Sequence, residues 1–164
     1  MVRRSRLIAL GAAVVALDQI TKSLVVSGLR EGESVRVIGD FLRLSHIRNS
    51  GAAFGALRGF SGLIALGALV GVIVFIAIVV KQPGLRTGIG AALVAAGATG
   101  NLVDRFVRGP IGRGTVVDFV DFRFWPAFNV ADSAITIGAL ILVWVGMTDR
   151  PRAKTHPGPG ASPD

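Results

Sequence analysis

Four apolar segments, separated by short polar stretches, divide the chain. They cover residues 7–29, 59–80, 87–103 and 130–148. A helix needs roughly 20 predominantly apolar residues to cross a membrane, within a range of about 17 to 25. The second segment carries no charge, whereas the third and fourth reach full length only when their polar ends, 101–104 and 129–132, are counted. The pattern predicts an all-α polytopic membrane protein with four transmembrane helices.

The first segment also fits a second interpretation, a cleavable signal peptide. The stretch "MVRRSR" is similar to the charged start of such a peptide, and "LIALGAAVVAL" is similar to its apolar centre. The apolar character resumes after Asp18 with "ITKSLVV", however, and this brings the segment to spanning length. We therefore expect a retained first helix.

The two stretches outside the apolar segments differ in pattern. Between the first two segments, "SVRVIGDFLRLSHIRN" alternates apolar and polar residues around a Gly-Asp pair, which is typical of a β-hairpin. We expect this insertion, about 30–58, to form a small extracytoplasmic β-hairpin at the membrane surface. The tail, 149–164, is rich in Pro, Gly and Ser and has no apolar period, which is typical of disorder. One membrane domain, 1–148, followed by a disordered cytoplasmic tail is expected.

Composition supports the membrane assignment and excludes other classes of protein. Apolar residues make up 51% of the chain, charged residues make up 17%, and the mean hydropathy is +0.62. The net charge of +8 does not indicate nucleic-acid binding, because the arginines flank apolar segments and form no basic stripe between aromatic residues. The chain has no cysteine, which excludes disulfides, thiolate metal ligands and a cysteine nucleophile.

Basic residues suggest how the four segments are oriented. Four spans place both termini on one side of the membrane, and the positive-inside rule makes the side richer in Lys and Arg cytoplasmic. The opposite side also has basic residues, after the third segment, so the asymmetry is incomplete. The residues on the side of the termini are Arg3, Arg4, Arg6, Lys81, Arg86, Arg150, Arg152 and Lys154. We expect cytoplasmic termini.

Carboxylates converge at the outer ends of the predicted helices. Asp18 lies past the midpoint of the first segment, Asp104 ends the third, and Asp132 begins the fourth. The loop that carries Asp118 and Asp121 must lie at the same face. An ionisable group within a span costs about 2.5 to 3.5 kcal/mol on insertion scales, so it usually faces the bundle interior and serves function. This convergence predicts a functional site.

Each of these aspartates alone also has a structural interpretation. Asp18 could form an i,i+4 ion pair with Lys22. Asp104 could be an ordinary interfacial carboxylate, and Asp132 could cap the fourth helix after Asn129. Their convergence on one face of a small bundle favours a site over three separate structural roles.

The residue types limit the chemistry of such a site. A metal site is disfavoured, because His46 lies in the hairpin, His156 lies in the tail, and no cysteine is present. A serine nucleophile with a lysine base, such as Ser133 with Lys22, needs a buried lysine, and the spacing does not favour it. Two aspartates need no further group, since close carboxyls share one proton and the ionised one can act as a base on water.

Two questions stay open from the residues alone. The stretch "VVDFVDF" offers both Asp118 and Asp121 as a partner for a second aspartate. Membrane carboxylates also occur in proton-coupled transporters and channels, which need them along a path through the membrane. The inner halves of the four segments have none, which disfavours a transporter. A purely structural membrane subunit is disfavoured further.

Five motifs occur in the order found in the lipoprotein signal peptidases, the signal peptidase II family. The chain resembles that family over nearly its whole length apart from the tail. The motifs are "DQITK", "NSGAAFG", "GNLVDR", "VVDF" and "FNVADSAITIG". The resemblance implies a four-helix aspartic endopeptidase of the bacterial inner membrane, with an outer β-cradle. Such enzymes remove the signal peptide of diacylglyceryl-modified prolipoproteins by cutting before the lipidated cysteine.

The resemblance also implies roles for individual residues. It makes Asp118, from "VVDF", and Asp132, from "FNVAD", the catalytic pair. It implies a monomer without a cofactor or metal, with prolipoproteins and membrane lipid as partners and a site near the outer face. The loops "RGPIGRG" and "RFWPA" depart from the family pattern and affect the expected contacts with substrate. The supporting positions are Asn49, Asn101, Asp104, Arg105, Asn129 and, in the first motif, Asp18.

Overall fold

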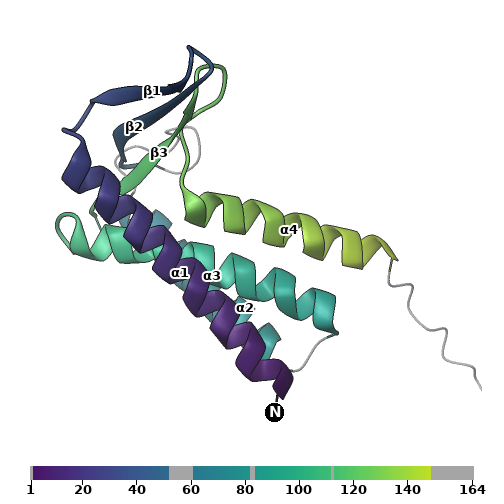
Figure 1. Ribbon diagram of the computed structural model, residues 1–164. Helices are drawn as coiled ribbons and strands as arrows, with labels where there is room; N and C mark the ends of the chain where they lie inside the picture. Colours follow the sequence, from purple (N-terminus) through teal and green to yellow (C-terminus); the bar gives the residue numbers. More distant parts are fainter. Residues whose placement is uncertain (1, 52–60, 82–83, 112, 149–164) are drawn as a thin grey trace, which may run out of the picture.

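Four helices and three strands make up the structure (Figure 1). The computed structural model describes residues 2–51, 61–81, 84–111 and 113–148. Both the end of the "NSGAAFG" motif and the tail, 149–164, lie outside the described residues. The elements in chain order are α1 (Val2–Gly28), β1 (Ser34–Ile38), β2 (Leu42–Asn49), α2 (Ser61–Val80), α3 (Leu85–Val107), β3 (Val116–Phe122) and α4 (Val130–Thr148).

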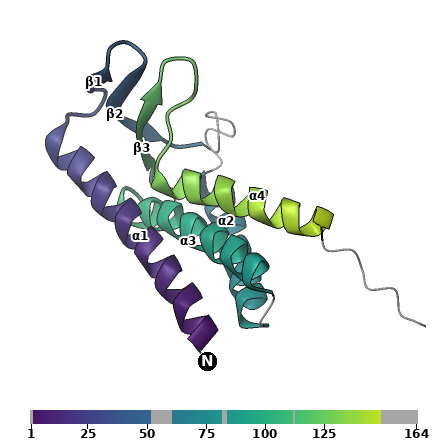
Figure 2. The same cartoon turned by 45° about the vertical axis from the view of Figure 1, so that its right-hand side comes forward.

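Helix α3 is the centre of the bundle, and α1, α2 and α4 all pack against it (Figure 2). Its buried face is made of small residues, among them Ala91, Ala95 and Gly97, which let the neighbouring helices come close. At Gly100, an added Cβ would lie 2.6 Å from Oδ2 of Asp18. The glycine of "GNLVDR" therefore makes room for a carboxylate of the first helix.

The outward faces of the helices are apolar. Leu66 on α2 is 57% exposed, and Leu140 on α4 is 64% exposed. Two helical segments, Arg4–Gly28 and Val130–Thr148, are long and apolar enough to cross a membrane. A third helical stretch, Ala65–Val80 of α2, is also apolar but shorter. Four helices are thus observed where four spans were predicted, and the full count of spans stays a prediction.

The strands form one antiparallel sheet in the order β1-β2-β3. The predicted hairpin is confirmed: β1 pairs with β2, and the turn between them contains Gly39 at φ 48°. The expectation of a loop at Asp118 and Asp121 is wrong, because Val116–Phe122 is a strand that pairs with β2. Its β-branched and aromatic residues suit a sheet. The sheet therefore has a third strand, which comes from the segment between α3 and α4.

The sheet lies at one end of the bundle, against the last turns of α1 (Figure 1). Val117 and Phe119 of β3 pack on Val25 of α1, and all three are buried. This apolar contact fixes β3 over the end of α3 and the beginning of α4. Predicted helix ends agree with the observed ones within a few residues, although α3 continues to Val107.

Candidate active site

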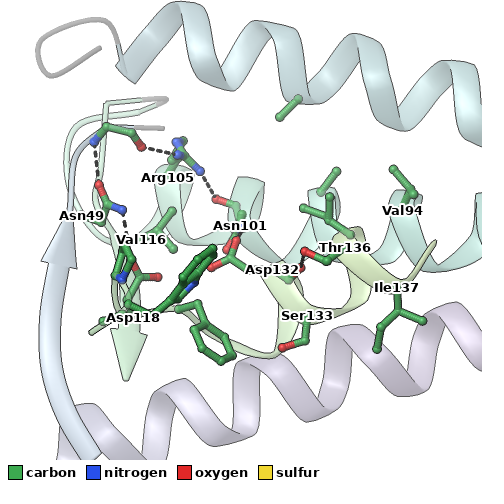
Figure 3. Close-up of a pocket in the computed structure, with 18 residues that line it drawn as sticks. Asn49, Val94, Asn101, Arg105, Val116, Asp118, Asp132, Ser133, Thr136 and Ile137 are labelled. Carbon is green, nitrogen blue, oxygen red and sulfur yellow. Dashed lines mark hydrogen bonds between the residues drawn. The ribbon is translucent and has the colours of Figure 1, made fainter. Parts of the chain in front are cut away.

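The carboxyls of Asp118 and Asp132 lie at one pocket of about 690 Å³ (Figure 3). Asp118 comes from β3 and Asp132 from the first turn of α4. The polar part of the lining also includes Asn49, Asn101 and Arg105. Four elements, β2, α3, β3 and α4, thus bring predicted site residues to one place.

Asp118 is buried, with 3% of its surface exposed. Its Oδ1 accepts a hydrogen bond from Nδ2 of Asn129 at 2.7 Å, and its Oδ2 accepts one from Nδ2 of Asn49 at 3.0 Å. Burial raises the pKa of Asp118 from 3.8 to about 6, and the negative charge of Asp132 acts in the same direction. The two amides lower it and offset part of the effect. Asp118 can therefore bind or release a proton near neutral pH.

Asp132 is held by a reciprocal cap at the start of α4. The backbone N–H of Asp132 donates to Oδ1 of Asn129 at 2.9 Å, and the backbone N–H of Asn129 donates to Oδ2 of Asp132 at 3.2 Å. This is the geometry of a capping box, with Asn129 as the N-cap. Oδ1 of Asp132 accepts a further hydrogen bond from Nδ2 of Asn101 at 2.8 Å. The expected helix-capping role and a role in the site thus coexist in one residue.

Asn129 connects the two carboxyls. Its side chain is fully buried, and its Nδ2 donates to Asp118 while its backbone N–H donates to Asp132. Nδ2 also lies 3.2 Å from Oδ1 of Asn101. One residue therefore fixes the position of both aspartates relative to each other.

A second buried group lies behind this pair and is built around Lys22. The ammonium Nζ of Lys22 contacts Oδ2 of Asp18 at 2.9 Å and Oδ2 of Asp104 at 3.0 Å. Asp104 also pairs with Nε of Arg108 at 3.0 Å and accepts the backbone N–H of Val117 at 3.1 Å. The ion pair expected between Asp18 and Lys22 is confirmed, and it extends to α3.

Arg105 lines the pocket and is 5% exposed. Its guanidinium donates to the backbone oxygens of Asn101 at 3.0 Å and Gly51 at 3.1 Å. Its Nε is buried and has no hydrogen-bond partner among the described residues. Arg105 therefore holds the segment after β2 against α3, at the edge of the pocket.

The structure separates the predicted site residues into two groups. Asn49, Asn101 and Asn129 contact the carboxyls of Asp118 and Asp132 directly, whereas Asp18 and Asp104 contact Lys22. Asp121 is in neither group, since its Oδ2 accepts a hydrogen bond from Oγ of Ser45 at 2.9 Å.

Sequence reasoning did not foresee the central place of Lys22 or the contacts of Gln19. Nε2 of Gln19 donates to Asp18 at 3.1 Å and to Asp104 at 3.3 Å. The signal was present in the position of both residues in "DQITK", beside Asp18 on one helix. The serine–lysine alternative has no support: Ser133 donates to the backbone oxygen of Asn129. Among the described residues, the ammonium of Lys22 bonds to Asp18, Asp104 and Asn101 and not to Ser133.

Apolar residues extend the pocket away from the aspartates. The helices α2 and α4 both pack on α3, and the lining includes residues of all three. These residues are Ala68, Val94, Ala98, Ile135 and Ile137. Within the described chain, no group of three or more His, Cys, Asp or Glu side chains is arranged to hold a metal ion. A polar end with two carboxyls and an apolar extension thus form one pocket.

Comparison with known proteins agrees with the motifs. The family described as "Signal peptidase (SPase) II" matches residues 10–148. The lipoprotein signal peptidase of Rhodococcus jostii (strain RHA1) is 45% identical over 145 residues, which cover 86% of this chain and 72% of the relative. That of Moorella thermoacetica is 40% identical over 139 residues, which cover 82% of this chain and 88% of the relative.

A solved structure shares the fold. It is described as a bacterial membrane enzyme determined by the in meso method at 2.3 Å resolution, and it matches with a TM-score of 0.82. The two chains are 31% identical, and the match covers 93% of each. The chain therefore belongs to the signal peptidase II family, the membrane proteases that remove signal peptides from bacterial prolipoproteins.

Proposed function

We propose that this chain is an aspartic endopeptidase in which Asp118 and Asp132 jointly activate a water molecule. Its substrates are diacylglyceryl-modified prolipoproteins, which it cuts directly before the lipidated cysteine. Family membership supports the protease and the class of substrate, and it disfavours the proton-coupled transporter that membrane carboxylates alone would allow.

One observation carries the assignment of the catalytic pair. Asp118 and Asp132 both line the pocket, and Asn129 bonds to both of them. Neither forms an ion pair with a Lys, Arg or His side chain in the part of the chain that the structure describes. Two neighbouring carboxyls without a direct counter-ion favour a state in which they hold one proton between them.

The chemistry then needs only the two carboxyls and water. The ionised carboxylate takes a proton from water while the water oxygen attacks the scissile carbonyl carbon, and the protonated carboxyl donates to the carbonyl oxygen. When the tetrahedral intermediate collapses, the C–N bond breaks, the leaving amine takes one proton, and a hydroxyl proton of the intermediate returns to the pair. The raised pKa of Asp118, about 6, supports a pair that can hold and release a proton during this reaction.

The remaining site residues position the pair and the substrate. Asn49, Asn101 and Asn129 hold the carboxyls through their amides. Arg105 lines the pocket, and its guanidinium is suited to a substrate carbonyl, because a guanidinium donates hydrogen bonds and accepts none. Asp18 and Asp104 do not contact the pair directly; they hold Lys22 in place.

The apolar extension of the pocket gives the substrate a path from the bilayer. It lies between α2 and α4 over α3, where Ala68 and Ala98 leave space beside Ile137, which is 52% exposed. A signal peptide or an acyl chain in the bilayer would meet apolar side chains here and the aspartates at its outer end. This arrangement supports lateral entry of a lipid-anchored substrate.

The topology that we propose has four spans, cytoplasmic termini and the site near the outer face of the inner membrane. Supporting it, the sheet and all the site carboxylates lie at one end of the bundle, and Arg86 contacts the ring of Trp144 at the other end, 5.4 Å from its centroid. Arg and Trp are both common at membrane interfaces.

A comparison of two precursor peptides tests this proposal. The peptides are identical except that one has a diacylglyceryl-modified cysteine after the cleavage site and the other has a free cysteine. Each methylene buried in the bilayer contributes about 0.8 kcal/mol, so the lipid concentrates the substrate and sets its depth. We expect the purified enzyme to cut the lipidated peptide at least about a hundredfold faster. Equal rates on both would contradict the proposed specificity.

A further inference from the structure

We propose that Lys22 is a positioning residue for peptide hydrolysis, which acts on Asp132 through Asn101. It fixes the amide of Asn101 so that this amide donates to Asp132, and its positive charge favours the ionised form of the catalytic pair. This inference rests on the proposed Asp118/Asp132 pair and goes beyond a counter-ion role for Lys22 toward Asp18 and Asp104.

The contacts of the ammonium group are complete and specific. Lys22 is fully buried, and its Nζ lies 2.9 Å from Asp18, 3.0 Å from Asp104 and 3.0 Å from Oδ1 of Asn101. An ammonium has three N–H donors, and these contacts use all of them. Two donors go to carboxylates and the third goes to an amide that itself bonds to Asp132.

The third contact determines which way the amide of Asn101 faces. An ammonium has no acceptor, so the amide oxygen must face Lys22 and the amide nitrogen must face away from it. That nitrogen, Nδ2, donates to Oδ1 of Asp132 at 2.8 Å. Asn129 reinforces the orientation, because its Nδ2 also lies 3.2 Å from Oδ1 of Asn101. A reversed amide would place two oxygens against each other at Asp132.

The charges around the pair explain why a single lysine matters. The side chains of α1 and α3 around this region bring three positive charges, Lys22, Arg105 and Arg108, and two negative charges, Asp18 and Asp104. From β2 only the neutral Asn49 contacts the pair, and α2 has no ionisable residue between Ser61 and Val80. Arg108 is paired with Asp104. The pair thus has few compensating charges, and burial outweighs Lys22 in setting the pKa of Asp118.

The experiment removes the charge of Lys22 without leaving an extra buried negative charge. Lys22→Met is combined with Asp18→Asn, which preserves the Asp104–Arg108 ion pair, and Asp18→Asn alone is the matched control. The purified variants are assayed on the lipidated precursor peptide for kcat and KM across pH, with melting temperatures as a check of folding. A second double variant, Lys22→Gln with Asp18→Asn, keeps a donor toward Asn101 but no charge. Asp118→Asn is assayed in parallel.

Relative to the Asp18→Asn control, the pH profile of kcat/KM in Lys22→Met/Asp18→Asn should move to higher pH by on the order of one unit. The sign follows because a lost positive charge favours the protonated form of nearby carboxyls. We expect kcat to fall about tenfold to a hundredfold, because Asn101 can then turn, while KM changes little. The Lys22→Gln/Asp18→Asn variant should show the same pH shift with a smaller loss of kcat.

The inference would be overturned if a folded double variant had the same kcat and the same pH profile of kcat/KM as the Asp18→Asn control. Lys22 would then be a counter-ion only. The parallel Asp118→Asn variant separates this failure from failure of the proposed function. If that variant is inactive and the profile is unshifted, only the role of Lys22 is wrong. If Asp118→Asn is still active, the catalytic pair is wrong, and the role of Lys22 falls with it.

Discussion

Two pairs of aspartates lie at the same end of the bundle, and the protein compensates their charges in different ways. Asp18 and Asp104 share a direct contact with the ammonium of Lys22. Asp118 and Asp132 instead accept hydrogen bonds from side-chain amides and a backbone N–H. A cation holds a neighbouring carboxylate in its charged form, whereas an amide positions a carboxyl without cancelling its charge. We infer that the first pair contributes to stability, whereas the second is available for the proposed proton transfer.

The comparison also explains why four aspartates gather at one end of so small a protein. Removing one partner from a buried ion pair usually costs about 3 to 5 kcal/mol, because the other charge is left uncompensated. The Lys22 group therefore acts as a rigid support. It joins α1 to α3, and Asp104 reaches β3 through the backbone N–H of Val117. Asp118, the next residue of β3, takes its position from that support.

The largest effect should come from the second pair. Asp118→Asn and Asp132→Asn each remove an acid or a base at nearly constant shape, so each should reduce kcat on the lipidated peptide by at least about a thousandfold. Because the two carboxyls act as a unit, the double variant should be hardly slower than either single one. All three should retain a folded state with a melting temperature near that of the unmodified protein. Substantial cleavage by both single variants would contradict an aspartic mechanism.

Substitution in the first pair, Asp18 and Asp104, should lower stability more than it lowers the rate of cleavage. Asp104→Asn removes a partner of both Lys22 and Arg108, so the melting temperature should fall by about 10 °C, which corresponds to roughly 3 kcal/mol. At a temperature where the variant is folded, cleavage should be reduced but measurable, since the two carboxyls that we propose as catalytic are still present. An Asp104→Asn protein that is inactive but has the melting temperature of the unmodified protein would contradict this assignment. Asp104 would then contribute to catalysis rather than to stability.

The helices and their polar ends could be predicted from the sequence, because long apolar runs have few alternatives in a membrane. Strand β3 could not, since its partner β2 lies about 70 residues earlier and its seven residues gain their order from that pairing. The clustering of the aspartates followed from the topology. The choice among them did not, because burial and the amides of Asn49 and Asn129 depend on the third strand.

The contacts of Lys22 also show which interactions local sequence spacing cannot predict. Its spacing from Asp18 predicts a local i,i+4 pair, and that pair exists. Its contacts with Asp104 and Asn101 come from α3, about 80 residues further along the chain. Local spacing therefore identified one of three partners, and the two that connect Lys22 to the candidate site required the packing of α1 on α3.

The smallest effect is expected at Asp121, in the same strand as Asp118. Side chains alternate along a strand, and three positions separate the two residues, so they point to opposite faces of the sheet. Asp118 faces the amides of the pocket, whereas Asp121 accepts a hydrogen bond from Ser45. Asp121→Asn keeps an oxygen for Ser45, so kcat/KM should stay within about threefold and its pH profile should not move. Ser45→Ala is the matched control, because it removes the same hydrogen bond from the other partner. An inactive Asp121→Asn enzyme together with an active Asp118→Asn enzyme would show that Asp121, and not Asp118, is the catalytic partner of Asp132. The face of β3 that points into the pocket during catalysis would then be opposite to the one described.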